Sequence, residues 1–138
     1  REARALRATI LRHPPGHMQR TAAYFLSLGH YDALIRRMGQ VFQARRTVME
    51  QALASHNLSF AGQKAGGGSS FWMRAPSGVD MRAVSHSLAN EGVLIEPGTI
   101  FFNDPHDHSN TYRLAYSSIP VERIPQGVAR IAAAVNVA

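Results

Sequence analysis

Between residues 31 and 55, apolar side chains recur at every third or fourth position without a proline. This spacing predicts one long helix with a single apolar stripe. The stripe consists of Leu34, Ile35, Met38, Val41, Phe42, Met49, Ala52 and Leu53. The opposite side carries mainly polar residues, which are expected to face solvent: Arg36, Arg37, Gln40, Gln43, Arg46 and Glu50.

Two shorter helices are predicted before the long one. Residues 2–12 place Leu6 and Ile10 on one side, and Pro14-Pro15 then interrupts the pattern. Proline is tolerated in the first turn of a helix, so a second helix is expected from about residue 15 to residue 28. Gly29 is expected to end or bend it.

The remainder of the chain alternates short extended segments with helices. Extended segments are predicted at 71–74, 93–95, 100–102 and 111–117, and helices at 81–91 and 122–135. Asp80 is placed to cap the first of these helices, and Gly92 to stop it. The order of elements predicts an α/β (α+β) sandwich, in which helices cover a small mixed or antiparallel sheet of about three strands.

Composition limits the classes of protein to consider. The length of 138 residues suits one compact domain, and the absence of cysteine excludes disulfides and thiolate chemistry. No apolar run approaches the ~20 residues of a membrane span, and no secretory leader precedes the first helix. These features are compatible with a cytoplasmic location.

The excess of basic residues is almost entirely arginine, giving a net charge of +6 with Lys64 as the single lysine. Basic domains can bind nucleic acid or acidic partners. Here the arginines are spread along predicted helices without interleaved aromatic residues, which favours solvated helix faces. A stand-alone basic binding module nevertheless stays open as an alternative of another class.

Two segments imitate known chemical motifs. Gly66-Gly67-Gly68-Ser69-Ser70 suggests a phosphate-binding loop, but Lys64 precedes the glycines and a strand follows them, whereas the Walker motif has lysine after the glycines and then a helix. A turn that allows close backbone approach is favoured. Lys64 in this glycine-rich loop is expected to be solvated, not a Schiff-base lysine.

The segment 104–108 (Asp-Pro-His-Asp-His) is the only cluster that resembles metal ligands, through His106 and His108. It is polar and loop-like, and no second ligand motif accompanies it, so no metal site is predicted. No nucleophile elbow is present either, and no catalytic residue is assigned.

Arg113 lies in the strand predicted at 111–117. Alternation places Tyr112, Leu114 and Tyr116 on one face, which is expected to be core, and Arg113 among small side chains on the other. A guanidinium held on a strand can bind a planar carboxylate in a bidentate manner. The alternative is an arginine that pairs with a nearby acid or reaches water.

Several segments together resemble the C-terminal small domain of fold-type I, pyridoxal-phosphate-dependent aminotransferases. They are Gly67-Gly68 with Phe71-Trp72, Glu91-Gly92-Val93, Pro97-Gly98, Tyr112-Arg113-Leu114 and the final stretch 122–131. The stretch 29–46 is similar to MocR-type regulators, GntR-family proteins that join a winged-helix DNA-binding domain to an aminotransferase-like domain.

The resemblance implies that residues 1–28 are the tail of a large domain with its crossover helices, and that residues 29–138 are the small domain. It also implies that Arg113 binds the α-carboxylate of an amino-acid substrate or effector. The cofactor implied for the parent protein is pyridoxal phosphate. Its Schiff-base lysine belongs to the large domain, so this fragment alone is expected to be inactive and to bind no cofactor covalently.

The function expected from the resemblance is that of a domain which closes over an amino-acid–pyridoxal-phosphate adduct in a transcriptional regulator. Its partners would be the large domain of the same chain, the amino-acid effector and, through a winged helix outside this sequence, DNA. The parent protein is expected to be a homodimer. The alternative within the family is the small domain of a genuine aminotransferase.

Overall fold

The structure is a computed structural model that describes residues 2–10, 13–62, 66–104 and 108–137. The chain divides into two compact units, Arg1–Gln40 and Val41–Ala138, which are described separately. The domain boundary expected between residues 28 and 29 stays a prediction. Among the described residues, no helix is both long and apolar enough to cross a membrane.

The first unit is helical, as predicted. It contains α1 (Glu2–Ile10), α2 (Gly16–Ser27) and the first part of α3 (His30–Ser55). Gly29 separates α2 from α3 with φ of +74°, a conformation that glycine adopts without strain. No residue of α1 or α2 is buried, so these helices have no core of their own within the described chain.

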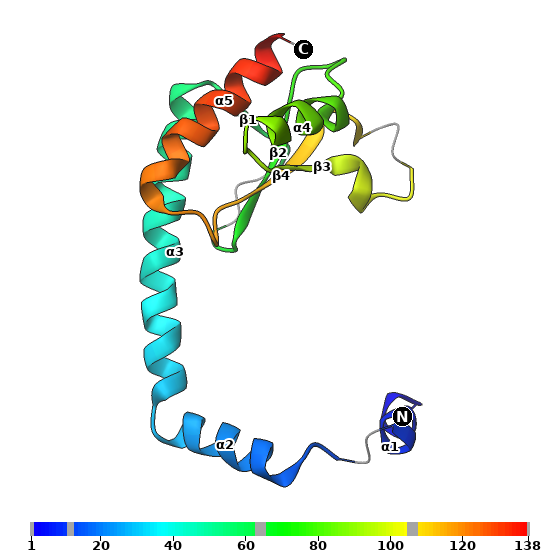
Figure 1. Ribbon diagram of the computed structural model, residues 1–138, viewed down its shortest axis with the longest axis vertical. Helices are drawn as coiled ribbons and strands as arrows, with labels where there is room; N and C mark the ends of the chain where they lie inside the picture. The colour runs from blue at the N-terminus through cyan, green and yellow to red at the C-terminus, as the bar shows by residue number, and fades with distance from the viewer. Residues whose placement is uncertain (1, 11–12, 63–65, 105–107, 138) are drawn as a thin grey trace. The chain divides into compact units, whose positions relative to one another are not determined.

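The second unit contains a four-stranded antiparallel sheet in the order β1-β2-β4-β3 (Figure 1). Its strands are β1 (Ser59–Phe60), β2 (Ser70–Arg74), β3 (Glu96–Pro97) and β4 (Thr111–Ala115). The long pairing is that of β2 with β4, in which Phe71 lies opposite Leu114 and Trp72 opposite Arg113. Strand β3 adds to the other side of β4, with Glu96 opposite Arg113.

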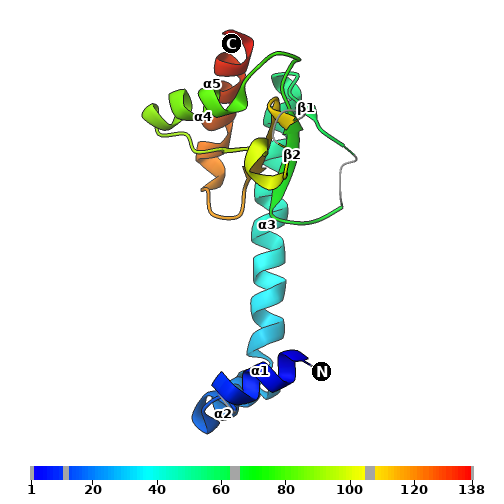
Figure 2. The same ribbon diagram turned by 90° about the vertical axis from the view of Figure 1, so that its right-hand side faces the viewer.

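Two helices accompany the sheet, and Figure 2 shows both on the same side of it. Helix α4 (Met81–Asn90) begins as predicted, because the Asp80 carboxylate accepts a hydrogen bond of 2.9 Å from the Arg82 N–H. Gly92, with φ of +77°, follows its end. Helix α5 (Ile124–Val137) comes after the short 3₁₀ turn η3 (Val121–Arg123).

The core lies between one face of the sheet and three helices. The sheet contributes Phe71, Met73, Tyr112 and Leu114, and Tyr116 follows directly after β4. The helices contribute Met49 and Leu53 of α3, Met81, Val84 and Leu88 of α4, and Ile124, Val128, Ile131 and Val135 of α5. The two-layer α+β class predicted from the order of elements is therefore confirmed.

Two predicted strands were wrong. Residues 93–95 do not pair, because the register with β4 begins only at Glu96. Residues 98–101 form the 3₁₀ helix η1 (Gly98–Phe101), where an extended segment was expected at 100–102. Both errors came from short apolar runs, whose extended or helical state depends on which neighbour they meet. The two-residue strand β1 was also missed, because Ser59-Phe60 is too short to show an alternating pattern.

The stripe predicted along α3 is buried only in part. Met49, Ala52 and Leu53, next to the sheet, are buried. Leu34, Ile35, Met38 and Val41 are between 37% and 52% exposed. The end of α3, from Met49 onward, thus has a core to join, whereas the apolar side chains up to Val41 are exposed.

Of the glycines in the described residues, Gly98 alone lies so close to another segment that a Cβ atom would clash, and that segment is β4. A Cβ atom at residue 98 would lie 1.9 Å from Thr111 Oγ1 and 2.8 Å from the Thr111 carbonyl oxygen. Gly98→Ala should therefore lower the free energy of unfolding by about 1–3 kcal/mol, since a packed core resists added volume. Urea unfolding of this chain measures the effect.

Gly127→Ala is the matched control for Gly98→Ala. Gly127 lies in α5, and a Cβ atom at this position would meet nothing within 4 Å beyond its chain neighbours and the backbone of its own helix. Alanine should therefore raise stability by about 0.5–1 kcal/mol through helix propensity. Equal effects of the two substitutions would contradict the close approach at Gly98.

Tyr112 is fully buried, and its hydroxyl has no hydrogen-bond partner among the described residues. Burial raises the pKa of Tyr112 from 10.0 to about 12. Because the folded state holds this proton more tightly than the unfolded state, the associated stability is complete below pH ~10 and lost as the pH rises toward 12. The loss should reach about 2–3 kcal/mol.

Tyr112→Phe should abolish that alkaline loss and, at pH 7, raise the free energy of unfolding by about 1 kcal/mol, because it removes an unpaired buried polar group. Urea unfolding at pH 7 and between pH 9 and 12 tests both effects. A less stable Tyr112→Phe variant at pH 7 would show that the hydroxyl makes a favourable bond.

Candidate carboxylate-binding site

Arg113 lies in the middle of β4, as the alternation predicted. Tyr112 and Leu114 point into the core, and Arg113 lies on the opposite face of the sheet. Since β4 is paired on both sides, by β2 and by β3, the backbone that carries Arg113 is held by hydrogen bonds along both edges. The site is thus built on one of the two central strands of the sheet.

Three side chains form a row across this face. Trp72 of β2 and Glu96 of β3 are both the direct cross-strand neighbours of Arg113. Directly opposed residues in an antiparallel sheet project to the same face, with Cβ atoms about 5 Å apart. The register therefore places an indole, a guanidinium and a carboxylate side by side.

The guanidinium of Arg113 has one polar partner among the described residues. Its Nε donates a hydrogen bond to Glu96 Oε2, and the two groups form an ion pair. Both side chains are partly accessible, at 41% and 42%. The alternative of an arginine paired with a nearby acid is thus present in the structure, and the acid is Glu96.

Aromatic rings border the cation. The guanidinium carbon lies 5.5 Å from the centroid of the Phe101 ring, within the range of a cation–π contact. Trp72 contacts Phe101 edge to face at 5.5 Å and Phe102 at 5.9 Å. Phe102 in turn stacks on His108 at 3.5 Å. We call the group Trp72, Phe101 and Phe102 the aromatic wall.

The charge of Arg113 is fixed over the whole accessible pH range. The hydrogen bond to Glu96 raises the pKa of Arg113 above its ordinary value, and the attraction between the two charges acts in the same direction. A permanent cation with a planar set of N–H donors, next to aromatic rings, is suited to bind a planar anion such as a carboxylate.

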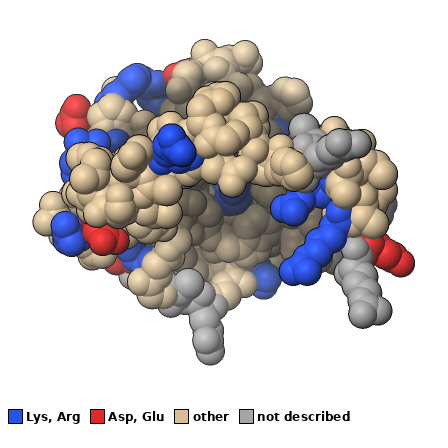
Figure 3. Space-filling view, turned by 90° about the horizontal axis from the view of Figure 1, so that it is seen from below, with Lys and Arg blue, Asp and Glu red and all other residues tan. Residues whose placement is uncertain are grey.

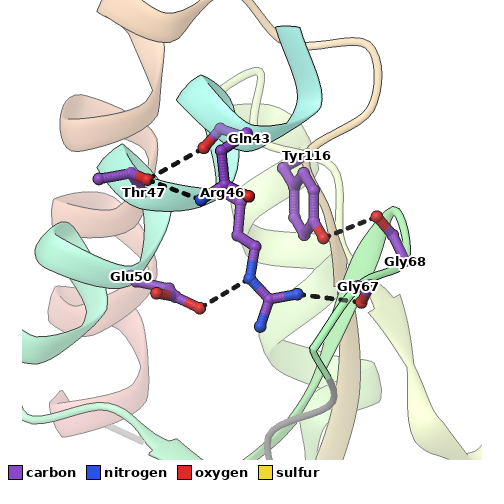
Figure 4. Close-up of polar contacts among 7 residues, drawn as sticks. All are labelled: Gln43, Arg46, Thr47, Glu50, Gly67, Gly68 and Tyr116. Atoms are coloured by element: carbon purple, nitrogen blue, oxygen red, sulfur yellow. Dashed lines mark hydrogen bonds and ion pairs between the residues drawn. The ribbon is translucent and has the colours of Figure 1, made fainter. Parts of the chain in front are cut away.

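The glycine-rich segment is anchored by its carbonyl groups (Figure 4). Arg46 of α3 donates to the Gly67 carbonyl at 3.0 Å, and the Tyr116 hydroxyl donates to the Gly68 carbonyl at 2.8 Å. A phosphate loop would direct N–H groups at its ligand. The described part of the segment instead directs two carbonyl groups at side-chain donors. A Cβ atom at Gly66, Gly67 or Gly68 would meet nothing within 4 Å, so the close backbone approach favoured by the sequence is not found at these glycines.

Arg46 departs from the solvated position expected of it. Its guanidinium forms an ion pair with Glu50 at 2.9 Å and lies 5.2 Å from the centroid of the Phe71 ring. Its side chain is only 11% exposed. Helical spacing indicates the apolar side of α3 but does not reveal that a loop will fold over a residue at the border of that side.

Two of the candidate residues considered from the sequence, His106 and Lys64, lie outside the described residues. The expectations for them therefore stay predictions. His108 stacks on Phe102. Within residues 2–10, 13–62, 66–104 and 108–137, no three His, Cys, Asp or Glu side chains are arranged to hold a metal ion.

Figure 3 shows arginine side chains in blue beside acidic and uncharged surface. Arginines of the first helices are exposed, as expected for solvated helix faces: Arg4, Arg7, Arg36 and Arg37.

Sequence reasoning placed Arg113 on the strand face opposite the core but missed its surroundings. Glu96 was not identified as its partner, because the strand was expected at 93–95 and its register with β4 could not be assigned. The aromatic wall was missed because Phe101 belongs to η1, which brings it back over β2 and not along an extended strand. The one available hint of a partner for Arg113 was Glu96 itself, an acidic residue directly before Pro97-Gly98.

Comparison with known proteins gives curated relatives of two kinds, a transcriptional regulator and an aminotransferase. The chain is 58% identical over 133 residues to the HTH-type transcriptional regulator TauR of Rhodobacter capsulatus, covering 96% of this chain and 28% of that protein. It is 30% identical over 105 residues to aromatic-amino-acid aminotransferase 1 of Thermococcus litoralis, covering 75% of this chain and 25% of that enzyme. No protein-family model matches the sequence.

A solved structure confirms the fold. The α-aminoadipate aminotransferase LysN of Thermus thermophilus superimposes with a TM-score of 0.78 at 26% identity, covering 96% of this chain and 34% of that one. The chain thus spans about a quarter to a third of the length of the proteins it matches.

The chain is therefore a C-terminal, aminotransferase-like domain of the fold-type I class. Its curated relatives include two HTH-type transcriptional regulators, TauR and the YdfD protein of Bacillus subtilis, in agreement with the resemblance to MocR-type regulators that the sequence motifs indicated.

The anchoring of the glycine-rich segment can be tested at Tyr116. Tyr116→Phe removes the hydrogen bond to Gly68 and should lower the free energy of unfolding by about 1 kcal/mol. Hydrogen exchange of the amides at 66–70 should become faster. The matched control is Tyr112→Phe, a buried tyrosine without a partner among the described residues, for which the opposite sign is expected. A neutral effect of Tyr116→Phe would contradict the anchor.

Proposed function

We propose that this domain binds the carboxylate of an amino-acid–pyridoxal-phosphate adduct within a MocR-type transcriptional regulator. The observation that carries the proposal is the guanidinium of Arg113, which projects from a doubly paired strand and contacts Glu96 through Nε alone among the described polar groups. A carboxylate can be bound at the remaining Nη1–Nη2 edge by two parallel hydrogen bonds.

The relatives support this proposal. TauR is described as an HTH-type transcriptional regulator, and the chain shares 58% of its residues over the matched region. LysN was crystallised with N-(5′-phosphopyridoxyl)-L-leucine, a compound that carries both a pyridoxyl phosphate and an amino-acid carboxylate. We infer that the adduct recognised by this domain is of the same chemical class.

The exposed apolar residues of α3 support a larger parent protein. Leu34, Ile35 and Met38 are spaced as a buried stripe but are well exposed in the described chain. We propose that a large aminotransferase-like domain covers them, with residues 1–28 as its tail and 29–138 as the small domain. A winged helix would supply the contact with DNA, and the parent protein would be a homodimer.

We place the Schiff-base lysine of the parent protein in the large domain. Lys64 is the single lysine of the chain and lies outside the described residues. The cofactor supplies electron-accepting chemistry at an amino-acid nitrogen when it is bound. In our proposal the large domain holds it, and this fragment alone neither binds it covalently nor transaminates.

The role of Arg113 in the parent protein would be to couple binding to domain closure. A carboxylate–guanidinium contact that forms only when the small domain approaches the adduct favours the closed state over the open state. The shift in population is limited by the difference in affinity between the two states. We propose that this shift is the signal passed to the DNA-binding segment.

A genuine aminotransferase is the second candidate, supported by the 30% identity to the enzyme of Thermococcus litoralis. The two candidates differ in the coding sequence upstream of Arg1. A winged helix before a large domain supports the regulator, and a large domain alone supports the enzyme. A start codon close to Arg1 would favour a stand-alone basic binding module instead.

Arg113 can be tested in the full-length protein with two probes. One is N-(5′-phosphopyridoxyl)-L-leucine, and the other is N-(5′-phosphopyridoxyl)-3-methylbutylamine, which has the same side chain but lacks the carboxylate. Arg113→Ala should lower the affinity for the first probe by at least about tenfold, because it removes a charged, bidentate partner of the carboxylate. The affinity for the second should not change. Isothermal titration calorimetry measures both.

Two further variants complete the test of Arg113. Arg113→Lys keeps the charge but loses the planar fork, so its affinity for the carboxylate probe should fall between those of the wild type and Arg113→Ala. Arg82→Ala, on α4, removes a cation from the other side of the sheet and should leave both affinities unchanged. Equal affinity of Arg113→Ala and wild type for the carboxylate probe would remove Arg113 from the site.

A further inference from the structure

The ion pair at Arg113 is asymmetric. The hydrogen bond runs from Nε to a single oxygen of Glu96, Oε2. A guanidinium has two edges able to bind a carboxylate, one formed by Nε with an Nη and one formed by Nη1 with Nη2. Glu96 therefore engages the Nε edge, and the Nη1–Nη2 edge has no polar partner among the described residues.

The backbone of Glu96 is held in a defined place relative to β4. Glu96 and Pro97 pair with Arg113 and Tyr112. The next residue, Gly98, packs so closely on Thr111 that no side chain fits between them. Since β3 cannot slide without breaking this contact, the Glu96 carboxylate meets Arg113 from a fixed direction.

The other side of the guanidinium is bounded by aromatic groups. Phe101 lies beneath it, and Trp72 is its cross-strand neighbour on β2. The carboxylate on the β3 side and the rings on the β2 side together restrict how the long Arg113 side chain can turn. Without such contacts an arginine side chain would lose its rotamer entropy when it binds a ligand.

We propose that Glu96 is a positioning residue, which holds the Nε edge of Arg113 so that the Nη1–Nη2 edge is presented to the ligand carboxylate. This inference rests on the proposed function. Glu96 would favour binding by pre-organisation, because the side-chain entropy of Arg113 is lost when the domain folds and not when the ligand binds.

A purely structural role explains the pair less well. Both side chains are about two-fifths exposed, and ion pairs in that environment contribute little to the stability of a fold. The pair is also remote from the core, which occupies the opposite face of the sheet. Substitutions at Glu96 are therefore expected to leave the domain folded.

The test compares Glu96→Gln with Glu96→Ala in the full-length protein. Both remove the negative charge, but glutamine keeps an oxygen that accepts from Nε. Glu96→Ala should bind N-(5′-phosphopyridoxyl)-L-leucine about five- to tenfold more weakly than Glu96→Gln does. Glu96→Gln should bind it at least as tightly as the wild type, because a like charge beside the ligand carboxylate has been removed.

The probe without a carboxylate, N-(5′-phosphopyridoxyl)-3-methylbutylamine, should bind all three proteins alike. Glu122→Gln, an acidic residue of η3, is the matched charge control and should leave both affinities unchanged. Thermal unfolding of each variant verifies that it is folded.

Three results would overturn the inference. If Glu96→Ala and Glu96→Gln bind the carboxylate probe equally, the hydrogen bond to Nε has no positioning role. If Glu96→Ala binds it more tightly than the wild type, Glu96 is a competitor of the ligand. If both probes lose affinity together, the role of Glu96 is structural.

Failure of this inference is separable from failure of the proposed function. If Arg113→Ala weakens only the carboxylate probe while the Glu96 variants agree with each other, the arginine binds the ligand without help from Glu96. If Arg113→Ala has no effect that depends on the carboxylate, the proposed function itself fails, whatever the Glu96 variants do.

Discussion

The antiparallel pairing of β2 with β4 determines most of what this domain can do. It runs over five residue pairs, from Ser70 opposite Ala115 to Arg74 opposite Thr111. Because side chains alternate along a strand, one register sends Phe71, Met73, Tyr112 and Leu114 into the core and sends Trp72 and Arg113 to the other face. A slip of one residue would exchange the two sets, so the core and the candidate site depend on the same hydrogen bonds.

The contact between Gly98 and Thr111 fixes the position of β3. It holds this short strand against β4, where two residue pairs alone would give little support. Glu96 reaches Arg113 as a result, and the turn η1 that follows carries Phe101 to the guanidinium. One glycine thus links the packing of the sheet to the composition of the site.

The two ends of α3 illustrate how burial follows context. Met49 and Leu53 lie where the sheet and α5 supply apolar neighbours, and they are buried. Leu34 and Ile35 belong to the same periodic pattern but remain exposed. The apolar pattern is the same in both parts of the helix. It therefore indicates which side of the helix would pack against another element, but not whether the described chain supplies that element.

Much of the fold could be predicted from sequence because the signals are local. Helix periodicity, the Asp80 cap, the stop at Gly92 and the alternation around Arg113 each depend on residues a few positions apart. The position of β3, the turn at Gly98–Phe101 and the strand β1 were not predicted. Each of these depends on pairing with a segment distant in sequence, for which a short apolar run carries no register information.

By itself, the sequence determined the class of fold and placed Arg113 on the face of a strand opposite the core. The tertiary structure alone decided what surrounds that arginine: Glu96 at its Nε edge, Phe101 below it and Trp72 beside it. The physical reason is that alternation along one strand fixes which way a side chain points, whereas its neighbours come from other strands, whose register is set by long-range hydrogen bonds and packing.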